Sequence, residues 1–263
     1  KLSAMGYDGI EWRMTADAGD RSKPTFWEGN RASIAPEEAI LQAETLKAKA
    51  KSLGLSFPSV AAYVDCQDLA KVDLNLKAAA ALGARNCRIN SGLWRAPMGR
   101  YMDLMKKCRA QYAEVAKMAA KHGVRALIET HPGQFCPSVF KALWVLDGLD
   151  PKHVGIMWDP SNQISEGGEK VPMILDMIGP YLGEVHVKNA RMVSSPGPGR
   201  QITWKNEPCP VWAGIIDWPK VIDLLKKSGY DGWLFFEDFS TEMPTEQRLR
   251  ENLAWFRELV GKA

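Results

Sequence analysis

Four short apolar runs after residue 123 each carry a polar side chain at or near their end. In chain order, these side chains are Glu129, Asp159, His186 and Glu237. Carboxylate and imidazole groups in this ratio suit Mn²⁺ or Mg²⁺ best, and they also accept Co²⁺ or Zn²⁺. Such a set is typical of a site where one divalent cation works beside an acid–base pair.

The four runs have the length and composition of buried parallel strands. Residues 124–132 lie between Gly123 and Pro132 and form a run that is too short for a typical helix. Amphipathic segments separate the runs, and residues 36–53, for example, begin with a proline and end before Gly54. Strands that alternate with helices indicate a parallel α/β architecture.

The other expected elements follow the same alternation. We expect further strands at residues 6–11, 55–64 and 84–90, and further helices at residues 65–82, 99–122, 137–149, 169–178, 217–228 and 244–260. Residues 13–35 and 190–216 are predicted to be long loops, since they are rich in glycine, proline and polar side chains. The pattern contains seven strands in all.

Polar side chains at the ends of many different strands favour a (β/α)8 TIM barrel over a doubly wound sheet. No glycine-rich dinucleotide turn follows any of the strands. The opening residues resemble the end of a helix that leads into a strand, so we expect the first barrel strand to precede Lys1. We therefore predict a single TIM-barrel domain over residues 1–263, with its active site at the carboxyl ends of the strands.

Composition excludes several classes of function. The chain has 263 residues, of which 46% are hydrophobic, so it is long enough to bury a large core. Its 34 basic and 31 acidic residues nearly balance and form no dense basic run, which argues against nucleic-acid binding. The five cysteines form no CxxC pair, which favours a reducing compartment. We expect a cytoplasmic protein that does not contact a membrane, although an export signal before Lys1 is an open alternative. A homo-oligomer is also compatible with a barrel of this size.

Five strings of the sequence resemble the xylose isomerase-like TIM-barrel superfamily, which includes sugar isomerases and epimerases. They are GYDGIE at residues 6–11, IETHP at 128–132, WDPSN at 158–162, EVHVK at 184–188 and GYDGWLFFE at 229–237. The resemblance covers nearly the whole chain and implies one divalent metal held by Glu129, Asp159, His186 and Glu237. The related endonuclease IV branch needs more histidines for its metal cluster than the four present here, which argues against a nuclease.

The resemblance implies a sugar isomerase or epimerase that acts on a keto-sugar or related polyol. Glu129 and Glu237 would transfer the proton through a metal-stabilised enediolate. Many ketose epimerases have a histidine three residues after the metal-binding aspartate, whereas this chain has Asn162. A dehydratase or lyase of a keto-inositol or 3-keto-glycoside is therefore one alternative, and a non-catalytic sugar-binding barrel is another.

Eight side chains are predicted to contact the sugar or polyol substrate. Lys188 shares the strand face of His186 and is suited to bind a substrate oxygen or assist a leaving group. Tryptophan rings at strand ends are suited to stack on apolar sugar faces. The predicted substrate-binding residues are Lys188, Asn162, His131, Arg88, Asn90, Trp12, Trp94 and Arg191.

Overall fold

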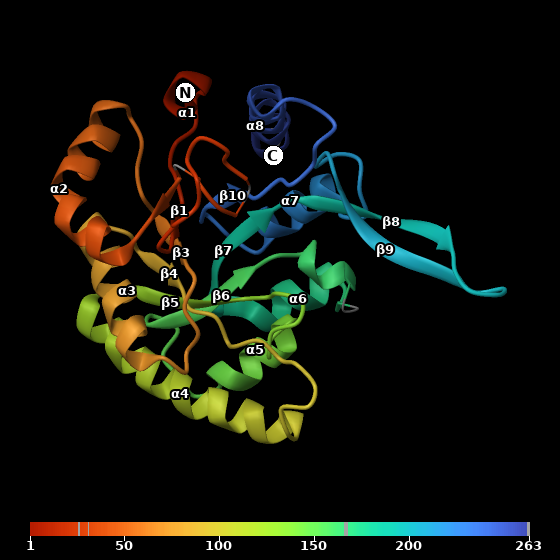
Figure 1. Cartoon of the computed structure of the whole chain (residues 1–263), viewed down its shortest axis with the longest axis horizontal. Helices are drawn as coiled ribbons and strands as arrows, with labels where there is room; N and C mark the ends of the chain where they lie inside the picture. The colour runs from red at the N-terminus through yellow and green to blue at the C-terminus, as the bar shows by residue number, and fades with distance from the viewer. Residues whose placement is uncertain (26, 31, 166–167, 262–263) are drawn as a thin grey trace.

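The structure is a computed structural model that describes residues 1–25, 27–30, 32–165 and 168–261. Its centre is a parallel sheet of eight strands that curls into an open barrel (Figure 1). Along the sheet the strands are β10 (Leu234–Phe236), β7 (Leu182–Val187), β6 (Val154–Trp158), β5 (Arg125–Glu129), β4 (Asn86–Arg88), β3 (Ser59–Ala62), β1 (Trp12–Met14) and β2 (Ser33–Ile34). Within the described residues, no strand pairing closes the sheet between β10 and β2. The predicted α/β class is confirmed, with the barrel incomplete.

Helices cover the outside of the curled sheet (Figure 1). They are α1 (Leu2–Met5), α2 (Pro36–Ser52), α3 (Leu69–Leu82), α4 (Tyr101–His122), α5 (Val139–Leu146), α6 (Val171–Ile178), α7 (Trp218–Lys227) and α8 (Thr245–Gly261). Helices α3 and α4 end at Gly83 and Gly123, whose φ angles of 77° and 66° glycine adopts without strain. Every predicted helix is present, and each helix in the described residues is too short or too polar to span a bilayer.

The core lies between the sheet and its helices, and it explains why the central strands read as continuous apolar runs. All five residues of β6 are buried, as are four of the five in β5. Strands covered on both faces need apolar side chains in both directions. Strand β6 accordingly contains no charged side chain, and the carboxylates Glu129 and Asp159 lie at or just beyond the carboxyl ends of β5 and β6, where the barrel opens.

The predicted loop at residues 190–216 was wrong. It contains an antiparallel hairpin of β8 (Asn189–Pro196) and β9 (Ile202–Cys209), which projects from the barrel (Figure 1). Two prolines and two glycines lie in the turn at residues 196–199, and Pro208 lies in β9, so the composition obscures both strands. Ile202 and Trp204, two residues apart on β9, share one face of the hairpin and are 58% and 61% exposed.

The expected boundary of the first strand was also wrong. Strand β1 begins at Trp12, directly after Glu11, and β2 lies within the predicted loop at residues 13–35. Before β1 the chain makes only an isolated parallel bridge, between Gly9 and Ser56. Glu11 therefore lies below the mouth of the barrel.

Candidate metal centre

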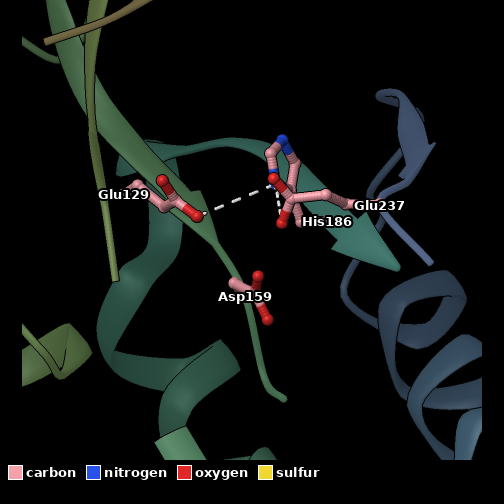
Figure 2. Close-up of side chains that lie close together, drawn as sticks. All are labelled: Glu129, Asp159, His186 and Glu237. Carbon is pink, nitrogen blue, oxygen red and sulfur yellow. Dashed lines mark ion pairs between the residues drawn. The ribbon is translucent and has the colours of Figure 1, made fainter. Parts of the chain in front are cut away.

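The four predicted ligands converge at the carboxyl ends of neighbouring strands (Figure 2). Glu129 is the last residue of β5, Asp159 follows β6, His186 lies on β7 and Glu237 follows β10. These strands are adjacent in the order β10-β7-β6-β5. One ligand atom from each side chain lies within 4.8 Å of all the others. The parallel register thus brings together groups that are more than a hundred residues apart in the chain.

The surroundings of His186 fit a cation at the centre of this cluster. Its Nδ1 atom lies 3.9 Å from Glu129 Oε1 and 3.6 Å from Glu237 Oε2. This nitrogen is buried and has no hydrogen-bond partner among the described residues. A buried polar atom without a partner is costly and calls for an explanation. A divalent cation shared with the carboxylates would satisfy Nδ1, so the residues form a candidate metal site.

Lys188 places a positive charge between two of the carboxylates. Its Nζ atom lies 2.7 Å from Asp159 Oδ2 and 2.6 Å from Glu237 Oε2. Burial lowers the pKa of Lys188, but these two carboxylates outweigh burial and hold it above its usual value. Burial raises the pKa of Glu237, but Lys188 and His186 outweigh it and hold that pKa well below its usual range. In contrast, burial prevails at Asp159 and raises its pKa.

Both carboxylate oxygens of Glu129 are held by neighbouring side chains. Arg88 Nη1 donates to Oε2 at 2.7 Å, and Asn162 Nδ2 donates to Oε1 at 3.2 Å. The backbone N–H of Asn162 also donates to Asp159 Oδ1 at 3.0 Å. The Arg88 guanidinium stacks over the Tyr63 ring at 4.6 Å. Arg88 and Asn162, predicted as substrate-binding residues, thus lie against the candidate ligands.

Glu11 was not assigned to the site from the sequence. Its Oε2 atom lies 3.0 Å from His186 Nε2, on the side of the ring away from the other candidate ligands. Burial raises the pKa of Glu11, but His186 outweighs burial and lowers it. Burial lowers the pKa of His186, but Glu11 reverses this and raises it well above its usual value. The sequence places Glu11 at the end of a predicted strand, but its contact with His186 depends on the three-dimensional register and has no signal in the sequence.

Two other predicted substrate-binding residues make their contacts elsewhere. The Trp12 ring packs edge-on against Phe57, with centroids 5.7 Å apart. Arg191, on the β8–β9 hairpin, forms ion pairs with Glu207 at 3.0 Å and Glu242 at 2.8 Å. Their contact with a substrate stays a prediction.

The last three predicted residues lie in loops near the strand ends. His131 Nδ1 faces the backbone oxygen of Pro132 at 2.7 Å. Asn90 follows β4 and forms a parallel bridge with Asp65. Trp94 is 42% exposed. None of the described contacts joins these three side chains to the four candidate ligands.

A cavity of about 770 Å³ lies beside the cluster, between β1 and β10, on the open side of the sheet. Glu11 and Glu237 both line it. Its wall also carries the aromatic rings of Trp27, Tyr63 and Phe239. Of the four candidate ligands, only Glu237 lines this cavity, and its wall also includes apolar side chains of β10 and α8.

Comparisons with known proteins agree with the fold. The crystal structure of 3-keto-D-glucoside 4-epimerase, YcjR, from E. coli is 18% identical, with a TM-score of 0.71 over 98% of this chain and 91% of that chain. The IOLI protein with a bound zinc atom is 17% identical, with a TM-score of 0.71 over 99% of this chain and 91% of that chain. A xylose isomerase-like TIM barrel protein from Mycobacterium smegmatis in complex with magnesium is 16% identical, with a TM-score of 0.70 over 98% of this chain and 85% of that chain.

These identities are low, so the structural likeness establishes the fold alone. No curated protein matches the chain by sequence. The sequence profile of one family, however, matches residues 1–259, which is nearly the full length. The chain therefore belongs to the xylose isomerase-like TIM barrel family.

Proposed function

We propose that the protein is a divalent-metal-dependent isomerase or epimerase of a keto-sugar or related polyol. The observation that carries this proposal is the convergence of three carboxylates on the unpartnered Nδ1 of His186. Glu129, Asp159, His186 and Glu237 would hold the metal, and the excess of carboxylates favours Mn²⁺ or Mg²⁺. When bound, such an ion polarises a substrate carbonyl and lowers the barrier to removal of the neighbouring C–H proton.

The two glutamates are suited to act as the acid–base pair. The side chain of Glu237 is 28% exposed and lines the cavity, whereas that of Glu129 is 1% exposed and held by Arg88 and Asn162. Glu237 therefore meets the substrate from the cavity side and Glu129 meets it from the strand side. One removes the proton, and the other returns or relays it. Lys188, between the carboxylates, donates a hydrogen bond to a substrate oxygen.

The fate of the proton decides the reaction class. Return of the proton to the opposite face of the same carbon is epimerisation, and return to the adjacent carbon is isomerisation. Expulsion of a β-hydroxyl or alkoxide, with a proton supplied by Lys188 or a glutamate, gives dehydration or lysis. All three outcomes begin with the same C–H cleavage, so one assay detects them together.

The test is deuterium exchange in D₂O. A panel of ketoses, keto-inositols and 3-keto-glycosides is incubated with Mn²⁺-saturated protein, and NMR follows both deuterium uptake next to the carbonyl and product formation. We expect uptake that stops on chelation and falls by about 10²-fold or more in Glu129→Gln and Glu237→Gln. Glu207→Gln, on the hairpin, serves as the matched control and should exchange like the wild type. Exchange that survives chelation would overturn the metal requirement. No exchange with any substrate despite bound metal would overturn the proposed catalysis and leave a sugar-binding barrel.

A further inference from the structure

The two ring nitrogens of His186 meet different groups. Nδ1 faces Glu129 and Glu237 and lacks a hydrogen-bond partner, while Nε2 lies 3.0 Å from Glu11 Oε2. The side chain of His186 is 1% exposed, so water does not compete for either nitrogen. A neutral imidazole carries one proton, and the group that accepts it decides which nitrogen keeps a free lone pair. Glu11 accepts at Nε2 and therefore leaves Nδ1 as the nitrogen that can bind a cation.

Glu11 is itself held in place by a buried polar network. Its Oε1 atom accepts a hydrogen bond from Ser59 Oγ at 3.0 Å. The same hydroxyl lies 2.9 Å from Glu184 Oε1, and Asn86 Nδ2 donates to Glu184 Oε2 at 3.0 Å. Glu184, Ser59 and Asn86 are all buried. The network fixes one Glu11 oxygen from below, so the other oxygen stays directed at the imidazole.

We propose that Glu11 is a positioning residue of the metal centre, which accepts the Nε2–H of His186 and so directs the Nδ1 lone pair toward the bound cation. A carboxylate behind a metal-binding histidine fixes the tautomer and the ring orientation, and it makes the ligating nitrogen more basic. This inference rests on the proposed metal-dependent function. It adds a fifth side chain, from the opposite edge of the sheet, to the four on β5, β6, β7 and β10.

A second cation held by Glu11, Glu184 and His186 is the competing interpretation, since their ligand atoms also lie within 4.8 Å of one another. The hydrogen bonds argue against it. Each of the four carboxylate oxygens of Glu11 and Glu184 lies within 3.0 Å of a polar atom of Ser59, Asn86 or His186. No ligand atom of these carboxylates is buried without a partner in the described part of the chain. We therefore interpret Glu11 and Glu184 as residues that orient His186 and not as ligands of a second cation.

The test compares Glu11→Ala, Glu11→Gln and Glu184→Gln with the wild type. Glu207→Gln, on the hairpin and outside this network, is the control, and Glu184→Gln tests whether the network that holds Glu11 affects metal binding. Calorimetric titration of the chelator-treated proteins with Mn²⁺ gives affinity and stoichiometry, and thermal unfolding checks that each variant is folded. NMR of the ¹⁵N-histidine-labelled, Zn²⁺-loaded proteins reports the proton on Nε2, which a purely structural role for Glu11 would not move.

We expect one Mn²⁺ per wild-type chain, with affinity reduced about 10–100-fold in Glu11→Ala and less in Glu11→Gln, whose amide oxygen still accepts a hydrogen bond. Glu207→Gln should bind Mn²⁺ like the wild type, and Glu184→Gln should lose less affinity than Glu11→Ala. The hydrogen-bonded Nε2–H signal of His186 should be lost in Glu11→Ala. Folded Glu11 variants that keep wild-type affinity for Mn²⁺ and an unchanged Nε2–H signal would overturn the role of Glu11 but not the proposed function. Two Mn²⁺ ions per wild-type chain would do the same. A wild type that binds no cation would overturn the proposed function and this inference with it.

Discussion

Replacement of Arg88 by Met should strongly destabilise the metal-free protein. Arg88 and Glu129 form an ion pair with Nη1 and Oε2 2.7 Å apart, and their side chains are 5% and 1% exposed. Removal of one partner of such a buried pair leaves the other charge without compensation and costs about 3–5 kcal/mol. Methionine keeps much of the length of the arginine stem, so the loss comes mainly from the charge. Glu129→Gln leaves Arg88 unpaired and should lower stability for the same reason.

The double variant Arg88→Met/Glu129→Gln separates charge from packing. It removes both charges, so its loss of stability should be smaller than the sum of the single losses by about 2–3 kcal/mol. Urea unfolding in the presence of a chelator, followed by tryptophan fluorescence, measures all four free energies. Saturating Mn²⁺ should then recover part of the loss in Arg88→Met, because the ion supplies the missing positive charge beside Glu129. Additive single losses, or a loss below about 1 kcal/mol in Arg88→Met, would refute the argument.

Two further predictions concern the charges around the metal. In Lys188→Met, Asp159 and Glu237 lose the ammonium group that lies between them, so the metal-free variant should be less stable than the wild type. Bound Mn²⁺ should restore most of this difference, which thermal unfolding with and without Mn²⁺ measures. An equal loss of stability with and without Mn²⁺ would contradict this prediction. The affinity for Mn²⁺ should rise with pH above 6.5, the usual pKa of histidine, because the pKa of His186 is raised well above this value and the ion must displace the proton of the imidazole. Calorimetric titration at several pH values measures this affinity. An affinity that does not change with pH would contradict the prediction. The stability of the metal-free protein should change with pH in the opposite direction. Protonated His186 stabilises the folded state fully below pH 6.5, and this contribution is lost as the pH rises through the raised pKa of His186.

The candidate ligands could be predicted because each lies at or near the end of a buried strand. Glu129 and Asp159 follow apolar runs whose parallel pairing is dictated by burial on both faces, and parallel strands present their carboxyl ends to one mouth. Sequence periodicity alone also places Lys188 on the face of His186, and the contacts of Lys188 with Asp159 and Glu237 agree with that.

Other features depended on three-dimensional register and could not be predicted. Glu11 lies below the mouth because the chain pairs through Gly9 before β1 begins, and a propensity for extended structure does not specify that break. The partner of Arg88 depends on which residue of β4 lies opposite which residue of β5. The hairpin at residues 189–209 was obscured by the proline and glycine residues at its tip and by Pro208 within β9.

The most direct test of the account is the number of divalent ions bound per chain. Chelator-treated wild type, Asp159→Asn and His186→Ala are dialysed against Mn²⁺, and bound metal is measured by elemental analysis alongside circular dichroism as a check of folding. The account predicts one ion per wild-type chain and little or none in either folded variant, since each has lost one of four ligands. A wild type without bound metal, or variants that bind as the wild type does, would contradict the assignment of the metal centre.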